Sequence, residues 1–328
     1  MFPEDRTRTI DTEKKYIIRA NQWVSRYFNN SSAQELDGEF IDYVVNQTRN
    51  KSFSNWRLVK ASLIHYLNHI GKNELANQLS DIDGTHTDRN CLIKRTSAKK
   101  KKSVSEKEAE QISKYLFSQI KHNAAGKYDK LTLAMFNAIL CVGLRPLEWC
   151  TCELIDECID GVDVEPPMLK VKNAKATNGR SFDEYRYVGL SMLDKYQMSF
   201  ISLTITLLSE LTNIEEKQVY VTMASRRLRA IYTKFYPKAQ EKVTMYSGRH
   251  QLIANLKVAG YSKVEIASVV GHGNDLTAGT HYARKARGNR SVNLPLPDKA
   301  AMNKIKVIES KFNINKIQSP NTDQSKIK

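Results

Sequence analysis

Two arginines, a histidine and a tyrosine in the second half of the sequence have the types and order that phosphate chemistry needs. Arg145 lies in the sequence GLRPLEW, and Arg249 lies in YSGRHQ. His272 comes 272 − 249 = 23 residues after Arg249, and Tyr282 comes ten residues after His272. Guanidiniums hold the non-bridging oxygens of a phosphate, an imidazole donates a hydrogen bond to it, and a phenol is a nucleophile. Together, such side chains could attack a DNA phosphodiester without a metal ion.

Predicted helix ends position these side chains. The first arginine follows a predicted helix over 131–142, and the second opens one over 248–260. The histidine follows a predicted helix over 262–270, after Gly271, because glycine readily forms the turn that ends a helix. The sequence therefore brings its candidate phosphate ligands to loop and helix-end positions.

The other elements follow from the apolar spacing and the turn residues of the second half. We expect three short strands in its middle, with a tight connection between the second and third, and helices on both sides. The predicted strands are 158–165, 168–173 and 184–190, and the other predicted helices are 105–120, 193–211, 215–222, 224–236 and 275–284.

The first 95 residues are predicted to form a helical bundle, because apolar residues recur at helical spacing. Basic side chains decorate this bundle, among them Arg57 and Lys60. Each taken singly fits a solvated helix face, but together they could follow a phosphate backbone. We therefore expect residues 1–95 to grip DNA.

A basic linker is predicted at 96–104. It contains a lysine run, and a capping-box start follows at Ser105, with Glu108 three residues later. Such a run is usually a flexible, solvated strap, and it would cross a DNA backbone if both domains held one duplex. The run is Lys99, Lys100, Lys101 and Lys102.

The composition favours a nucleic-acid partner. The 328 residues suggest about two domains. The net charge of +16 points to a polyanion, first nucleic acid and second an anionic membrane. No apolar run approaches the ~18 residues of a membrane span. The charged N-terminus is unlike a signal peptide, so we expect a cytoplasmic protein, nucleoid-associated if bacterial.

The cysteines predict neither a disulfide framework nor a metal site. Their number is five, which is odd. Cys150, Cys152 and Cys158 cluster, but a metal site would need a fourth ligand and a more usual spacing. We expect these cysteines to be thiols that are buried or have no chemical role.

The order of Arg145, Arg249, Gly271-His272 and Tyr282 resembles that of the tyrosine recombinases, also called phage integrases. The resemblance covers roughly residues 128–285, and residues 10–95 only by general pattern. It implies a mainly α fold with a small antiparallel β-sheet. The implied parts are an N-terminal helical, SAM-like core-binding bundle and a recombinase catalytic domain at 105–290.

The resemblance also implies the roles of the site residues. Arg145 and Arg249 would clamp the phosphate, His272 would face it, and Tyr282 would be the nucleophile. Two further residues would support the site. Glu148 would orient it or simply be a favoured first-turn acid, and His250 would buttress it or be a core histidine.

Two positions leave alternatives open. Lys172 would protonate the departing 5′ oxygen if its pKa were lowered, with Lys175 as the runner-up. Tyr246 stands where the family usually has histidine. Its hydroxyl could donate a hydrogen bond, but it does not titrate near neutral pH, so acid–base work could be weakened. In a third reading Tyr246 only packs and nothing fills the role.

The implied reaction is site-specific cleavage and rejoining of duplex DNA through a 3′-phosphotyrosyl link, with no metal or nucleotide cofactor. The implied assembly is a homotetramer on two DNA sites, serving integration, excision or resolution of a mobile element. Residues 291–328 form a tail whose predicted helix, 298–312, would either exchange between protomers or pack on its own domain. The alternatives are a type IB topoisomerase-like enzyme, an inactive DNA-binding relative and an RNA-binding protein.

Overall fold

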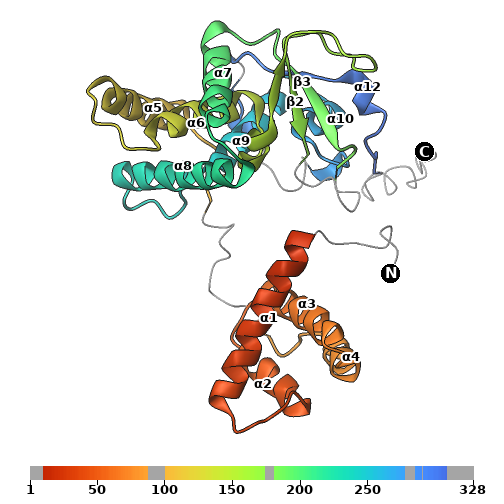
Figure 1. The fold of residues 1–328 in the computed structure, drawn as a ribbon. Helices are drawn as coiled ribbons and strands as arrows, with labels where there is room; N and C mark the ends of the chain where they lie inside the picture. Colours follow the sequence, from red (N-terminus) through yellow and green to blue (C-terminus); the bar gives the residue numbers. More distant parts are fainter. Residues whose placement is uncertain (1–9, 88–99, 174–180, 278–284, 290, 309–328) are drawn as a thin grey trace, which may run out of the picture. The chain divides into compact units, whose positions relative to one another are not determined.

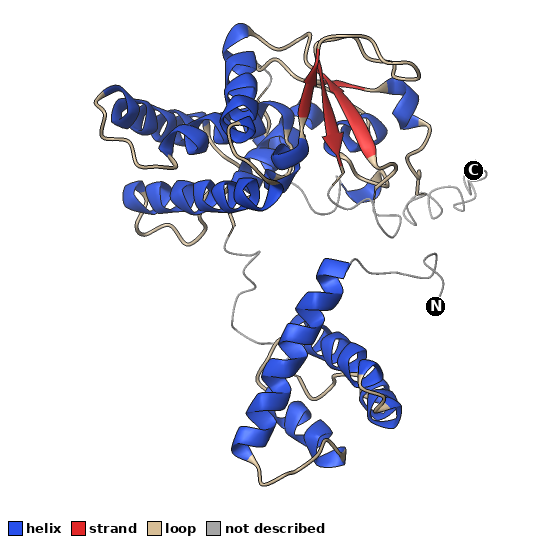
Figure 2. Cartoon of the chain, in the orientation of Figure 1, coloured by secondary structure: helices blue, strands red, loops and turns tan. Residues whose placement is uncertain are grey.

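The computed structural model describes residues 10–87, 100–173, 181–277, 285–289 and 291–308 (Figure 1). The chain divides into two compact units, Met1–Ser97 and Ala98–Lys328. It is mainly α-helical with one small antiparallel sheet (Figure 2), which confirms the fold class predicted from the sequence.

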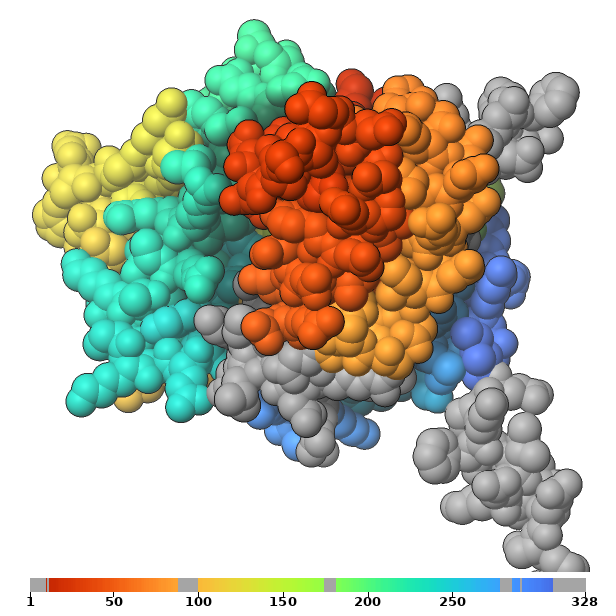
Figure 3. All heavy atoms as spheres, turned by 90° about the horizontal axis from the view of Figure 1, so that it is seen from below, coloured from red at the N-terminus to blue at the C-terminus, as the bar shows by residue number. Residues whose placement is uncertain are grey.

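The first unit is a helical bundle around one apolar core. Trp56, Leu63 and Leu67 of a single helix are almost completely buried in it, together with Phe40. The space-filling view shows the side chains of this unit as a closely packed body (Figure 3, red to orange). Its helices are α1 (Ile10–Asn30), α2 (Gly38–Thr48), α3 (Phe53–His69) and α4 (Asn73–Asp81).

The second unit is built around α6 (Asp129–Val142), which is buried along most of its length. Its neighbours, α7 and α9, bury apolar residues against it in the same core. The remaining helices of the unit are α5 (Glu106–Lys121), η3 (Pro146–Thr151), α7 (Lys195–Ser209), α8 (Ile214–Phe235), α9 (Met245–Val258), α10 (Lys263–Val270), η5 (Lys285–Arg287) and α12 (Lys299–Met302).

The two helices predicted at 215–222 and 224–236 are one continuous helix, α8. Asn213 caps its first turn, since its side chain accepts a hydrogen bond from the N–H of Glu216 at 2.8 Å. No glycine or proline interrupts the sequence from there to Phe235. The predicted break was therefore wrong, because the chain offers nothing to end the helix at its middle.

The sheet has four antiparallel strands in the order β1-β2-β3-β4. β2 (Met168–Lys172) and β3 (Tyr185–Gly189) form the predicted hairpin, in which Val171 pairs with Arg186. The strand predicted at 158–165 is wrong. Gly161 has a left-handed φ of 78° and the N–H of Val162 bonds to the carbonyl of Ile159, so this stretch turns. The outer strands are β1 (Glu153–Ile155) and β4 (Leu296–Pro297).

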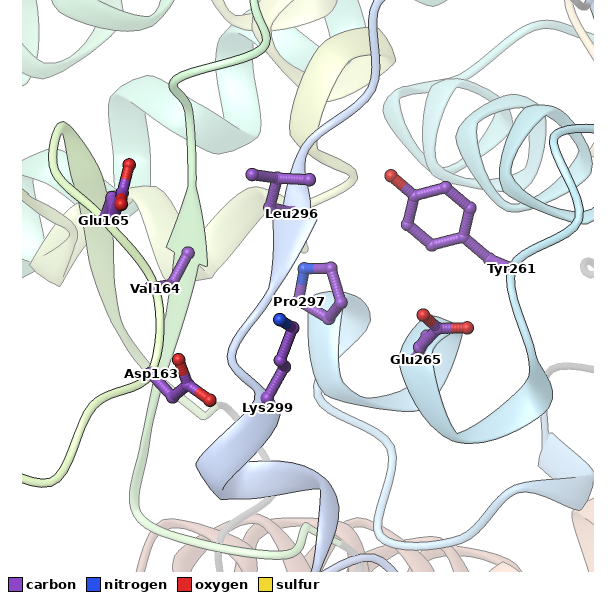
Figure 4. A pocket seen from close by; sticks show the side chains of 8 residues that line it. All are labelled: Asp163, Val164, Glu165, Tyr261, Glu265, Leu296, Pro297 and Lys299. Atoms are coloured by element: carbon purple, nitrogen blue, oxygen red, sulfur yellow. The ribbon is translucent and has the colours of Figure 1, made fainter.

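The described part of the tail folds onto its own unit. β4 pairs with β3, and a pocket of about 330 Å³ lies where β4 meets Tyr261, Glu265 and the chain around Val164 (Figure 4). The predicted helix over 298–312 is confirmed only over Lys299–Met302 and is wrong over 303–308, because α12 ends at Met302. The chain then turns so that the N–H of Lys306 bonds to the carbonyl of Gly273. Residues 309–312 lie outside the described residues.

The start of the second unit includes part of the predicted linker. The N–H of Lys101 bonds to the carbonyl of Lys242 at 3.0 Å, and Val104 is buried. The predicted capping box at Ser105 and Glu108 is present and begins α5. The described residues 100–104 are therefore fixed to this unit by hydrogen bonds and burial.

Candidate active site

Arg145 is positioned by the turn that ends α6. Gly143 has a left-handed φ of 66°, and a Cβ there would lie 2.5 Å from Leu252 Cδ2, so glycine is required. Arg145 follows in extended conformation at the start of η3. Its backbone N–H and its Nη1 both donate to the carboxylate of Glu148, at 2.8 and 2.6 Å. Glu148 thus fixes both the backbone and the guanidinium of Arg145.

Arg249 connects the ends of α6 and α10. Its side chain is completely buried in α9. Nη1 donates to the carbonyl of Gly143 and Nη2 to that of Val270, each at 2.6 Å. Nη2 also lies 3.1 Å from Nε2 of His272. This guanidinium therefore holds the Gly143 turn, the end of α10 and the histidine together.

His272 leaves α10 through Gly271, whose φ is 68°. Because a guanidinium only donates, His272 Nε2 accepts from Arg249 and the ring proton lies on Nδ1. Burial, followed by the positive charges of Arg249, Arg145 and Arg186, lowers the pKa of His272 to about 2. The imidazole is therefore neutral at ordinary pH.

Arg186 completes the cluster and is a residue that the sequence analysis missed. Its Nη2 donates to Glu148 Oε2 at 2.7 Å, its Nε donates to the carbonyl of Val269 at 3.1 Å, and its Nη1 donates to Asn173 Oδ1. Arg186 and Val188 occupy alternate positions of β3 and both are buried. The sequence contained a signal for this: in the predicted strand 184–190, Arg186 alternates with Val188 and therefore lies on the face that is expected to be buried.

The guanidiniums of Arg145 and Arg186 therefore share one buried carboxylate, and the charge of Arg249 also acts on it. Burial acts to raise the pKa of Glu148, but Arg186, Arg145 and Arg249 outweigh it and hold that pKa well below its usual range. With Glu148 ionised and His272 neutral, the cluster carries two net positive charges. Such a concentration of guanidiniums suits a phosphate, which accepts hydrogen bonds from them and compensates their charge.

A cavity of about 430 Å³ opens beside the cluster, and Arg145 and Tyr246 both line it. Tyr246 is 38% exposed, and Lys100 Nζ lies 5.2 Å from the centre of its ring. Thr244 caps the start of α9, two residues before Tyr246, and its backbone N–H donates to Ser247 Oγ at 2.9 Å. Two further arginines of α8, Arg226 and Arg229, line the same cavity.

Lys172 is not brought into the cluster. It is the last residue of β2 and pairs with Tyr185, so it lies on the sheet face opposite to Arg186. Its half-exposed side chain forms an ion pair with Glu184 at 3.0 Å. The hydrogen bond with Glu184, followed by Tyr185, raises the pKa of Lys172, which is opposite to the shift a proton donor needs.

His250 is largely buried, whereas the described lysines of the predicted DNA-binding run are exposed or paired with a carboxylate. Burial, with Lys102, Arg249 and Lys100 nearby, lowers the pKa of His250 to about 4, so it is neutral near pH 7. Lys100 and Lys102 are exposed, but Lys101 pairs with Glu108.

In the first unit, Arg57 is exposed. Lys60 instead donates to the carbonyls of Ser80 and Ile82 at 2.7 and 2.6 Å, at the end of α4. Tyr282, Lys99 and Lys175 lie outside the described residues.

Within the described parts of the chain, no group of three or more His, Cys, Asp or Glu side chains is arranged to hold a metal ion. Cys150 and Cys152 are buried thiols and Cys158 is an exposed one. Among the helices that the structure describes, none is long and apolar enough to cross a membrane.

Solved structures that are similar to the chain include two whose descriptions name a recombinase or an integrase. The crystal structure of XerA recombinase is 17% identical and has a TM-score of 0.38; the match covers 85% of this chain and 90% of that one. The crystal structure of a lambda integrase dimer bound to a COC′ core site is 13% identical, also with a TM-score of 0.38, and the match covers 83% and 79%. No protein-family model matches the sequence, and no curated protein matches it.

Proposed function

We propose that this chain is a tyrosine recombinase that cleaves and rejoins duplex DNA. The observation that carries the proposal is the convergence of Arg145, Arg249 and His272. Arg145 follows the end of α6, His272 follows the end of α10, and Arg249 lies within the first two turns of α9. Hydrogen bonds join the three beside Glu148. The sequence order of these residues and the late Tyr282 is the family's order, and the net charge of +16 suits a DNA partner.

In the proposed reaction the phenol oxygen of Tyr282 attacks phosphorus and the bond to the 5′ oxygen breaks. A 3′-phosphotyrosyl link and a free 5′ hydroxyl result, and attack by a 5′ hydroxyl of a partner strand reverses the step. Arg145, beside the cavity, would bind the non-bridging oxygens. Arg249 and the Nδ1–H of His272 would stabilise the charge that develops on them.

The proton for the departing 5′ oxygen would come from the β2–β3 hairpin. Lys172 at its described end is paired with Glu184, and its pKa is raised. We therefore favour Lys175, three residues later, over Lys172 for this role. A substrate with sulfur at the 5′ bridging position needs no proton donor. If Lys175 is the donor, Lys175→Ala should cleave ordinary DNA slowly, and this substrate should restore its cleavage rate. It should not restore a rate lost in Lys172→Ala, and the opposite pattern would identify Lys172 as the donor.

The test of the reaction class uses nicked duplexes that carry candidate sites from the DNA flanking the gene. We expect a covalent protein–DNA adduct on a denaturing gel, lost in Tyr282→Phe and kept in the control Tyr196→Phe, whose ring is 80% exposed. Adduct formation by Tyr282→Phe at the wild-type rate would refute the assigned nucleophile.

A second candidate function is a DNA-binding relative without catalysis. It is favoured by Tyr246, which stands at the family's histidine position and lines the cavity beside Arg145. If Tyr246 acts by donating a hydrogen bond to phosphate, Tyr246→Phe should slow adduct formation by about 10- to 100-fold, since such a bond contributes roughly 1.5–3 kcal/mol. Tight binding with no adduct on any site would favour the second candidate, and Tyr246→His would then test whether histidine restores cleavage.

We further propose a tetramer on two DNA sites and a role in integration, excision or resolution of a mobile element. The protein would act in the cytoplasm, at the nucleoid in a bacterium. Sedimentation of the complex with one and with two sites tests the assembly. A topoisomerase-like enzyme would instead relax supercoiled DNA as a monomer.

A further inference from the structure

The segment Lys285–Asn289, three residues after Tyr282, is held against α9. Asn289 donates its backbone N–H to Asn255 Oδ1 at 2.8 Å. Gly288 lies so close to the helix that a Cβ there would be 2.3 Å from the carbonyl oxygen of Ala254. This segment therefore has a fixed position on the helix that carries Arg249.

The strap Lys100–Ser105, which precedes α5, lies on the same segment together with Glu106, the first residue of α5. Arg287 Nη1 donates to Ser103 Oγ at 3.1 Å, and Asn289 Nδ2 donates to the carboxylate of Glu106. The strap is itself anchored through Lys101, as described above. The segment after Tyr282 is thus enclosed between α9 and the strap.

Gln251 joins the three parts with a single amide. Its Oε1 accepts the N–H of Val104 at 3.0 Å, and its Nε2 donates to the carbonyl of Arg287 at 2.7 Å and to Asn255 Oδ1 at 2.9 Å. Both ends of the amide are used, and the residue is only 8% exposed. Gln251 also lies two residues after Arg249 in the same helix.

We propose that Gln251 is a positioning residue for the nucleophile, an inference that rests on the proposed function. Fixing Arg287 and Asn289 fixes the C-terminal anchor of the segment that carries Tyr282. A fixed anchor reduces the conformations that the phenol must lose before it attacks. The anchor is bonded to Gln251 and Asn255 of the helix that also carries Arg249, so the amide ties the residues after the nucleophile to a phosphate ligand.

Gln251→Leu tests this, because leucine keeps the size of the side chain and removes its hydrogen bonds. We expect the single-turnover rate of adduct formation at saturating DNA to fall by about 10- to 100-fold, since misplacement of a reacting group by about 1 Å has effects of that order. DNA affinity should stay within about twofold, because phosphate contacts are untouched. Gln251→Glu keeps the acceptor for Val104 but loses the donor to Arg287, and should behave like Gln251→Leu.

The matched control is Gln111→Leu. Gln111 lies in α5 of the same unit, and its Oε1 accepts the hydroxyl of Tyr236 at 2.6 Å. This variant should lose stability and keep its adduct rate. A Gln251→Leu rate within about twofold of wild type would overturn the inference. So would an equal loss of rate in Gln111→Leu, because the effect would then be one of stability.

Hydrogen exchange separates this inference from the reaction itself. The Asn289 amide should exchange at least about tenfold faster in Gln251→Leu than in wild type, since its acceptor Asn255 loses a hydrogen-bond partner. Unchanged exchange at Asn289 would overturn the inference even where the wild-type protein forms the adduct. Faster exchange in a protein that forms no adduct would support the anchor and count against the proposed reaction alone.

Discussion

Arg186 acts on the candidate phosphate ligand Arg145 through the carboxylate that both arginines contact, that of Glu148. It is a fully buried cation that donates to Glu148, Asn173 and the backbone of α10. Glu148 is also shared with Arg145. Loss of Arg186 would therefore disturb a phosphate ligand that it does not contact directly, because the orienting carboxylate would lose one of its two guanidinium partners.

Arg186→Ala should lower the free energy of unfolding by about 3–5 kcal/mol, because it leaves the carboxylate of Glu148 buried with one partner fewer. Urea unfolding measures this. The control is Lys170→Ala on the neighbouring strand, whose partly exposed pair with Glu153 at 3.7 Å should contribute no more than about 1 kcal/mol. Equal losses in the two variants would contradict a special role for Arg186.

Acid should unfold the protein in two ranges. The pKa of His272 falls from its ordinary value of 6.5 to about 2 in the folded state. Between these values the unfolded chain binds the proton and the folded chain does not, so stability decreases as pH falls below 6.5. His250, with its pKa lowered to about 4, adds to this loss. Glu148, whose pKa is depressed, adds a further loss once pH falls below its ordinary value of 4.5.

The expected slope is at most about 1.4 kcal/mol per pH unit for each group. His272→Gln should flatten the dependence between pH 6.5 and 4, measured as unfolding free energy at each pH. A slope unchanged by this substitution would mean that His272 is protonated in the folded state, contrary to its burial among three guanidiniums.

At the scale of elements, the site depends on helices that end in glycine. Gly271 is the sharpest case, since an added Cβ would lie 2.4 Å from Asn173 Oδ1 and 2.7 Å from Arg186 Nη1. The turn that presents His272 and the packing of the Arg186 guanidinium therefore both require the same small residue. One glycine thus couples the end of α10 to the sheet.

Gly271→Ala should destabilise the protein by about 2 kcal/mol or more beyond the strain of a left-handed alanine, which itself costs about 1–2 kcal/mol. Gly260→Ala is the matched control, because Gly260 also has a positive φ, 93°, but a Cβ there meets nothing within 4 Å. Thermal or urea unfolding of the two variants gives the difference directly. Equal destabilisation of Gly271→Ala and Gly260→Ala would mean that Asn173 and Arg186 move away from the added Cβ without loss of stability, which contradicts the prediction.

At the scale of the whole molecule, the excess positive charge should make DNA binding depend steeply on salt. Each lost phosphate contact should reduce the slope of log K against log salt by about 0.9. We expect this reduction for Lys102→Ala and Arg226→Ala, whose side chains are exposed or line the cavity. Lys60→Ala should leave the slope unchanged, because its ammonium donates to Ser80 and Ile82. A reduction in Lys60→Ala equal to that in Lys102→Ala would contradict this division.

The elements themselves were largely predictable where the apolar period was long or a capping signal was present. α6, α9, α10 and the β2–β3 hairpin follow from spacing, and the capping box at Ser105 was readable from two residues. The predictions at 158–165, within α8 and at the start of the tail were wrong. The first and the last of these stretches depend on turns or on backbone hydrogen bonds to distant residues, which local periodicity does not encode. α8 was divided in error, because its sequence contains no residue that would end a helix.

By itself the sequence determined the mainly α fold and the order of the candidate residues, with Arg145 and His272 placed after helix ends, because these depend on residue type and local spacing. The meeting of Arg145, Arg249 and His272 around Glu148 required the packing of α6, α9 and α10. The inclusion of Arg186 and the exclusion of Lys172 were decided by strand register, since a change of one residue reverses the face on which a side chain lies. The amide of Gln251 connects residues more than a hundred positions apart, a relation that only the tertiary structure could establish.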